Sequence, residues 1–194
     1  MSVIQDNTIS TNSITEATSA NGVSIDGLKV KDYSLMYGSN IGLTITSDGY
    51  ATKPNLPAFV AHSETSGSGY QNTSDVFPAN ATNHNQGNHF NTGSSGVSKH
   101  SFTAPVDGVY LFTFSSLNSN TSNTSRPMFY VNGSSTYNGI KHGLSNGDNN
   151  GSNTNVTSSL IKLSANDYVQ VKSQNGNLYY YDYQHSTFTG CLIG

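Results

Sequence analysis

Apolar residues recur at every second position in many short stretches of the chain, and glycine, asparagine and serine separate these stretches. The clearest one is SFTAPVDGVYLFTF, in which Tyr110, Phe112 and Phe114 fall on one side of a strand and Val109 and Leu111 on the other. Alternation over short segments bounded by turn residues is typical of β-strands. The sequence therefore predicts an all-β fold of the sandwich or barrel kind.

The second part of the chain contains a series of such stretches. Strands are expected at 57–62, 74–78, 99–105, 107–117, 126–133, 135–143, 156–163, 167–173, 177–183 and 186–194. Polar stretches at 80–98, 118–125 and 144–155 separate some of them and are expected to be loops. Many short strands joined in this way favour a jelly-roll sandwich.

The first part of the chain has a weaker strand pattern. Asp26 and Gly27 stand between alternating apolar residues, which predicts a hairpin, and a second alternating piece spans 40–50. Isolated hairpins are marginally stable, so this part must pack on something else, most simply on copies of itself. We therefore expect a β-rich stem or attachment segment at residues 1–51 and a head domain at residues 52–194.

Two stretches are apolar on both sides of the strand. In 109–114 one face can fill a sandwich core, and the other needs a cover that a two-layer sandwich does not provide. The stretch 186–194 has the same character and ends in an apolar strand. A neighbouring subunit is the natural cover for the outer face, and 186–194 is expected to lie in the centre of a sheet.

Composition excludes several classes of protein. Only 10% of the 194 residues are charged and the net charge is −3, so the chain lacks the basic footprint of a nucleic-acid binder. No apolar run reaches the roughly 20 residues that span a bilayer, and the start of the chain does not resemble a secretory signal peptide. The single cysteine, Cys191, excludes a disulfide within one chain.

Residues 57–194 carry the motifs of a known family in the right order. These are PAFVAH, Phe77 with Asn83, Phe102 followed by G-x-Y-x-F-x-F from Gly108, LIKLSANDYVQV, and STFTGCLI. The set resembles the C1q/tumour-necrosis-factor-like jelly-roll family. The sequence departs from the family where Asn166 replaces a usual glycine, where Phe90 comes two residues late, and where a collagen-like stem is absent.

The resemblance implies a homotrimer of jelly rolls that recognises a ligand and does not catalyse a reaction. Trimer or core packing is expected from Phe59, Phe77, Phe102, Tyr110, Phe112, Phe114, Phe188 and Leu192. No Ser-His-Asp arrangement or Gly-x-Ser-x-Gly turn is visible, which agrees with a protein that is not an enzyme.

The stretch ITEATSANGVSIDGLKVKD resembles short segments repeated in structural and tail-fibre proteins of marine bacteriophages. This resemblance implies a trimeric virion protein at the phage surface, namely a short fibre, a spike or a capsid decoration protein. Its expected partners are its own copies, a capsid or tail protein bound through residues 1–50, and a host surface glycan or protein. The alternative is a secreted cellular C1q/TNF-like ligand or lectin.

Ligand binding is expected in the polar loops, because recognition usually resides in loops on a rigid scaffold. The candidate residues are Asn118, Asn120, Asn123, Asn146, Asp148, Asn149 and Asn150. No cofactor is expected, and the metal ligands stay unknown. Calcium is left open because of Asp75, Asp107, Asp148, Asp167 and Asp182, although none forms a D-x-D-x-D-G loop. His62 is the candidate for a metal ligand on a trimer axis.

Overall fold

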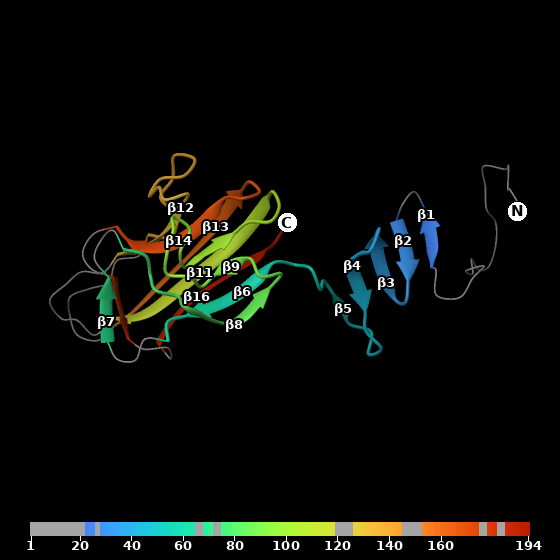
Figure 1. Cartoon of the computed structure of the whole chain (residues 1–194), viewed down its shortest axis with the longest axis horizontal. Coiled ribbons are helices and arrows are strands. Elements are labelled where there is room, and N and C mark those ends of the chain that lie inside the picture. The colour runs from blue at the N-terminus through green and yellow to red at the C-terminus, as the bar shows by residue number, and fades with distance from the viewer. Residues whose placement is uncertain are drawn as a thin grey trace, which may run out of the picture. The chain divides into compact units, whose positions relative to one another are not determined.

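The structure is a computed structural model that describes residues 22–25, 28–64, 68–71, 75–118, 126–144, 153–174, 178–181 and 185–194. The chain divides into two compact units, residues 1–55 and 56–194 (Figure 1). The boundary expected between residues 51 and 52 falls inside the short strand β5 (Ala51–Thr52). Because β5 pairs with β4 (Asn40–Ile45), residues 51 and 52 belong to the first unit.

The first unit is one antiparallel sheet in the order β1-β2-β3-β4-β5. Its first three strands are β1 (Val23–Ile25), β2 (Leu28–Lys31) and β3 (Ser34–Tyr37). The pairing of β1 with β2 is the predicted hairpin, although its two turn residues lie outside the described ones. The strand β3 was not predicted, since SLMY is too short to show a pattern of its own.

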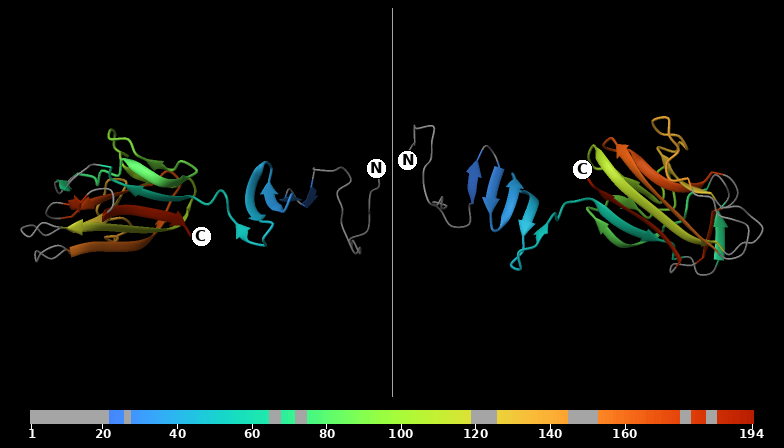
Figure 2. Two further views of the ribbon diagram at one scale, coloured as in Figure 1. Left: turned by 90° about the horizontal axis from the view of Figure 1, so that it is seen from below. Right: turned by 180° about the vertical axis from the view of Figure 1, so that it is seen from behind.

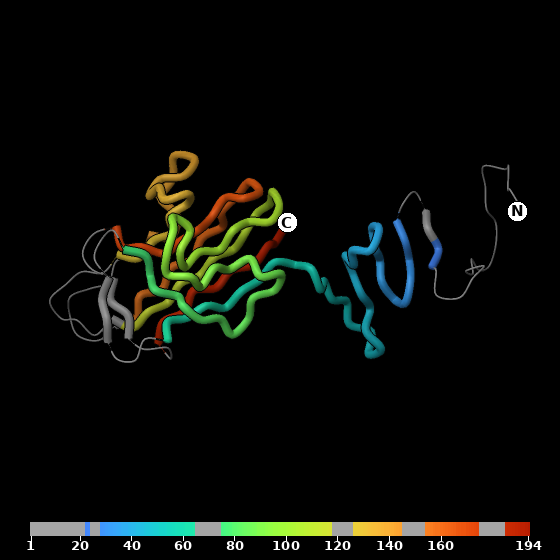
Figure 3. The backbone as a smooth tube through the Cα atoms, viewed as in Figure 1, coloured from blue at the N-terminus to red at the C-terminus, as the bar shows by residue number. Residues whose placement is uncertain are grey.

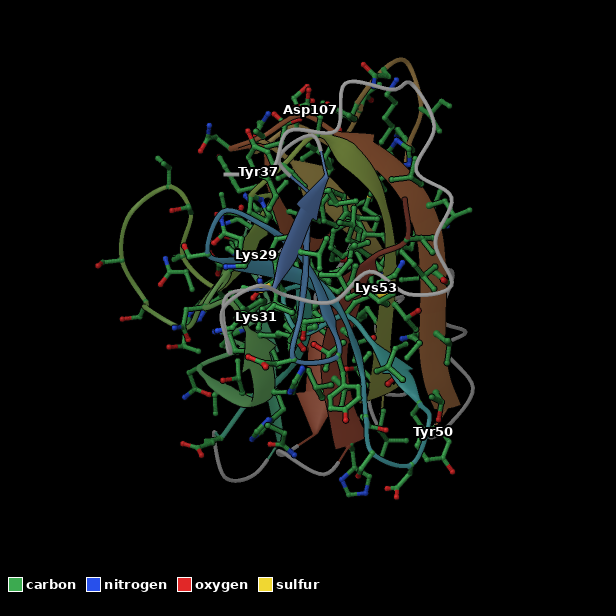
Figure 4. The ribbon with its side chains drawn as sticks, turned by 90° about the vertical axis from the view of Figure 1, so that its right-hand side faces the viewer. Lys29, Lys31, Tyr37, Tyr50, Lys53 and Asp107 are labelled. Carbon is green, nitrogen blue, oxygen red and sulfur yellow. The ribbon has the colours of Figure 1, made fainter. Side chains whose placement is uncertain are left out.

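The two faces of this sheet differ in character. Leu28 lies opposite Tyr37 on the neighbouring strand, and Val30 belongs to the same face; these side chains are 45%, 74% and 53% exposed. Lys29 and Lys31, labelled in Figure 4, alternate with them along β2 and therefore belong to the other face. The first unit therefore has one face of exposed apolar side chains and one mixed face, on which Lys29 stands in register with Met36 and Ile41. The first of these faces is open in the single chain.

The second unit is a sandwich of two sheets (Figure 2). The four-stranded sheet has the order β12 (Pro127–Val131), β14 (Tyr168–Ser173), β10 (Ser101–Thr103) and β9 (Phe90–Asn91). The five-stranded sheet has the order β13 (Asn153–Leu163), β11 (Gly108–Asn118), β16 (Ser186–Leu192), β6 (Ala58–His62) and β8 (Ala81–Gln86). A separate two-stranded ribbon joins β15 (Leu178–Tyr181) to β7 (Ser68–Gln71).

The last strand of the chain is central in the five-stranded sheet. β16 pairs with β11 on one side and with β6 on the other, so the first and last strands of this unit lie side by side (Figure 3). β11 pairs along its whole length with β13. The prediction of a central position for 186–194 is confirmed.

The core between the two sheets is aromatic. All eight phenylalanines of the chain are buried there, each with an exposed fraction of 4% or less. The ring of Phe59 stacks on Phe102 at 5.2 Å and meets Phe188 edge-on at 4.9 Å between ring centroids. Gly190 allows the rings to pack this closely, because a Cβ atom at that position would lie only 2.6 Å from ring atoms of both Phe59 and Phe112.

Three of the expected elements differ from the structure. Of the expected strand 74–78, the described residues 75–78 form only an isolated bridge at Val76, and the expected loop 80–98 contains β8 and β9. The expected strand 135–143 is an irregular segment with single bridges. Positive φ angles at Asn138, Gly139 and Gly143 turn the backbone of that segment away from an extended strand.

Candidate functional site

The outward face of the five-stranded sheet is a candidate interaction surface. Along β11, Tyr110, Phe112 and Phe114 point into the core and are fully buried, so Leu111 points outward and is 36% exposed. Residues that pair in register with Leu111 on the neighbouring strands also point outward and form a row across the sheet. The row runs Leu160, Leu111, Cys191, Ala58 and Gln86.

Large aliphatic side chains are concentrated toward β13 and β11 on this face. Val156 and Leu160 of β13 are 57% and 58% exposed, and Ile193, which follows β16, is 53% exposed. The backbone N–H of Ile193 donates to the carbonyl of Val109, which extends the sheet by one more pair. Contiguous exposed apolar surface on a folded protein usually marks an interaction site.

The polar side chains among them already bond to one another. Thr113 and Ser158 hydroxyls lie 3.2 Å apart, and Ser115 and Thr187 hydroxyls lie 2.9 Å apart across neighbouring strands. Hydroxyls that have partners within the sheet lose little when water is removed from it. The face can therefore be covered by another protein without leaving these groups unsatisfied.

The face carries few charges. Lys162 lies at one end of β13, and His62 and His84 lie on β6 and β8. His62 lies opposite Ala81, and His84 lies opposite Val60, so both imidazoles belong to the outward side. In the described part of the sheet no carboxylate accompanies them on this side.

The aromatic residues expected to serve trimer or core packing lie inside the sandwich of one chain. Seven of them are buried with exposed fractions of 2% or less, and Leu192 is partly buried against the same core. The seven are Phe59, Phe77, Phe102, Tyr110, Phe112, Phe114 and Phe188. The outward surface is built instead by the alternate residues of the same strands. The sequence-based list of packing residues did not distinguish residues of this surface from residues of the core.

The candidate binding loops fall almost wholly outside the described residues. Asn118 is the last residue of β11, which runs further into the expected loop than predicted. Asn120, Asn123, Asn146, Asp148, Asn149 and Asn150 lie outside the described residues. Their role in recognition stays a prediction.

Two of the aspartates considered for calcium organise turns. Asp107 Oδ1 accepts a hydrogen bond from the backbone N–H of Ala165 at 2.7 Å. Asp167 accepts from the Tyr137 hydroxyl at 2.7 Å and from the backbone N–H of Ser164 at 2.9 Å. Among the described residues, no three His, Cys, Asp or Glu side chains gather as a metal site would require.

Asp167 is held in its ionised form by these donors. Burial acts to raise the pKa of its carboxyl, but hydrogen bonds from Asn132, Tyr137 and Ser164 outweigh burial and hold the pKa below its usual value. The same bond from Tyr137 raises the pKa of that phenol. The carboxylate thus ties three segments of the head together.

His100 is a buried titratable group of the head. Its Nδ1 lies 3.1 Å from the carbonyl oxygen of Ala79, and its backbone has a φ of +49°. Burial lowers the pKa of the imidazole; the hydrogen bond to Ala79 opposes this shift and the nearby charge of Lys99 adds to it. The folded head therefore favours the neutral ring.

Acidification is expected to destabilise the head through His100. Because the folded pKa lies below the unfolded value of 6.5, the neutral ring contributes fully above that pH, and the contribution is lost as the pH falls through the folded pKa. Asn tolerates a positive φ and does not titrate, so His100→Asn should reduce the fall in melting temperature between about pH 7.5 and about pH 5. The exposed residue His185, replaced by Asn, is the control; an equal reduction in both variants contradicts the assignment.

Comparisons with known proteins concern the second unit. The family model described as C1q domain matches residues 58–193. The search of curated proteins gives no match. No helix in the described part of the chain is long and apolar enough to cross a membrane.

Solved structures resemble the chain at low sequence identity. Eiger TNF from S. frugiperda is 12% identical with a TM-score of 0.53, and the match covers 72% of this chain and 94% of that one. Murine APRIL is 11% identical with a TM-score of 0.50, covering 71% and 99%. The globular domain of zebrafish complement 1qA protein is 20% identical with a TM-score of 0.48, covering 72% and 98%.

At these identities the structural likeness concerns the fold, which is an all-β jelly-roll sandwich of the C1q/TNF kind. The family match begins at residue 58 and ends at residue 193, and it spans most of the second unit. It does not extend over the N-terminal segment, whose phage resemblance stays a prediction. The chain belongs to the C1q domain family.

Proposed function

We propose that this protein is a homotrimeric recognition head in which three copies associate through the outward face of the five-stranded sheet. The observation that carries the proposal is the row of exposed aliphatic residues on that face, centred on Leu111 and Leu160. Their polar neighbours bond within the sheet, and no carboxylate stands among the described residues of the face. Membership of the C1q domain family supports self-association.

The first unit is proposed to attach the head to a phage particle. Its sheet has an open apolar face, with Leu28, Val30 and Tyr37 exposed, and a single-layer sheet with such a face needs a cover. Other copies of the sheet or a capsid or tail protein supply that cover. The resemblance of residues 14–32 to phage structural segments supports this role, which makes the protein a short fibre, spike or decoration protein at the virion surface.

The head is proposed to bind a host surface glycan or protein and not to catalyse a reaction. The loops at 118–125 and 144–155 are rich in Asn, Ser and Gly, which offer adaptable hydrogen bonding without net charge. A single loop site of this kind binds weakly. Three copies on one trimer raise the overall strength of attachment where receptors are dense.

A secreted cellular C1q/TNF-like ligand or lectin is the second candidate function. Two of the solved structures that resemble the chain, Eiger TNF from S. frugiperda and murine APRIL, come from animals, which favours it. The two candidates share the trimeric head and differ in what the first unit attaches to.

Removal of residues 1–55 is expected to separate head assembly from particle attachment. The truncated head should remain a trimer, because its proposed interface lies wholly in the second unit. An antibody against the head should label intact virus particles of the source that were made with the full-length protein. It should not label particles made with the truncated protein in its place. Undiminished incorporation of the truncated head contradicts the attachment role, and absence of the full-length protein from particles favours the secreted ligand.

A further inference from the structure

A polar hollow of about 400 Å³ lies at one end of the sandwich, where it borders the outward face at Lys162, two residues along β13 from Leu160. It is lined by Asp107, Tyr137, Asn138, Lys162, Leu163 and Ser164. Asp107 stands just before β11, whereas the candidate loop at 118–125 follows the far end of the same strand. The hollow is therefore separate from the loops to which recognition is assigned above, and its volume falls within the range of small-ligand sites.

The walls of the hollow are held in place by the Asp167 network. One carboxylate oxygen of Asp167 accepts from the Tyr137 hydroxyl and from the N–H of Ser164, and the other accepts from the Asn132 amide at 2.7 Å. Tyr137 is thus fixed as an aromatic wall, with its hydroxyl already bonded. A site built in advance in this way loses little conformational entropy when a ligand binds.

The side chains that line the hollow include both hydrogen-bond donors and hydrogen-bond acceptors. Asp107 uses Oδ1 for the backbone of Ala165, which leaves Oδ2 to accept from a ligand. Lys162 only donates, and the Asn138 amide both donates and accepts. Asp107 and Lys162 carry opposite charges, and the ionised Asp167 behind the wall is already bonded to Asn132, Tyr137 and Ser164. The lining therefore offers no cluster of free like charges to an anion such as phosphate or to a metal cation.

We propose that this hollow binds a neutral saccharide unit. Neighbouring hydroxyls of a pyranose both donate and accept, which matches a carboxylate, an ammonium group and an amide placed around one space. The aromatic wall of Tyr137 suits the apolar C–H face of a sugar ring. The inference rests on the proposed recognition role and names a glycan, rather than a protein, as the class of partner for this part of the head.

Ligand-observed and protein-observed NMR on the full-length chain tests the site directly. The probes are D-glucose, D-galactose, D-mannose and N-acetyl-D-glucosamine, with inorganic phosphate and Ca²⁺ as comparison ligands. We expect saturable binding of at least one sugar in the millimolar range. Asp107→Asn retains the acceptor for Ala165 and Lys162→Met retains the length of the side chain, and each should weaken binding about tenfold or more.

The matched controls are Asp48→Asn and Lys29→Met in the first unit, which should leave sugar binding unchanged. The proposal is overturned if none of the four sugars binds. It is also overturned if Asp107→Asn or Lys162→Met leaves the affinity for the sugar unchanged. Binding of phosphate or Ca²⁺ at these residues in place of a sugar also overturns it. Sedimentation of the same samples reports the trimer independently, so loss of the sugar site leaves the assembly proposal standing.

Discussion

Phe112→Ala is expected to lower the free energy of unfolding by about 3–5 kcal/mol, because it removes a fully buried ring and leaves a cavity. The ring of Phe112 lies 5.6 Å from Phe102 and 6.0 Å from Phe188 between centroids, so it joins the two sheets of the sandwich. The neighbouring Gly190 cannot fill the space, since it has no side chain. Chemical denaturation at one fixed protein concentration measures the change.

Thr113→Ala is the matched control, because Thr113 is the next residue of β11 and points to the outward side. Its loss removes one hydroxyl contact with Ser158 and should cost far less than the loss of the buried ring. Equal effects of the two substitutions, or an unchanged stability in Phe112→Ala, contradict the assignment of inward and outward faces along this strand.

Leu111→Asp is expected to dissociate the trimer into folded single chains. The substitution places a carboxylate in the middle of the proposed interface, three times in each trimer, and a buried charge without a partner costs several kcal/mol. Within the single chain Leu111 is 36% exposed, so the carboxylate stays hydrated and the sandwich should remain folded. Sedimentation velocity and circular dichroism together distinguish dissociation from unfolding.

Leu144→Asp provides the control for this substitution. Leu144 is 49% exposed and lies outside the strands of the five-stranded sheet. The same chemical change there should leave the trimer intact. A Leu111→Asp protein that remains trimeric shows that the outward row is not the interface.

The sequence predicted the head well where alternation was strong. In β11 the aromatic residues at even positions define the core. The apolar residues at odd positions indicated that the outward face of this strand is apolar too. The strand β8 was missed because ATNHNQ contains almost no apolar residue. It is an edge strand that pairs with β6 alone in its sheet, so its position is set by backbone pairing and not by burial of its side chains.

The surfaces of the candidate sites were harder to predict. Val156 and Leu160 join Leu111 on one face only through the register between β13 and β11, which the sequence does not encode locally. The polar hollow gathers Asp107, Tyr137 and Lys162 from three distant segments. Asp107 stood out only as one of five aspartates considered for calcium, and no local pattern places Tyr137 or Lys162 beside it.

Sedimentation equilibrium of the full-length chain at micromolar concentration is the most direct test of the central claim. We expect a particle with three times the 20.6 kDa mass of the chain, stable on dilution through the micromolar range. A folded protein that sediments with the mass of a single chain contradicts it, because the aliphatic row on the outward face would then remain open to water.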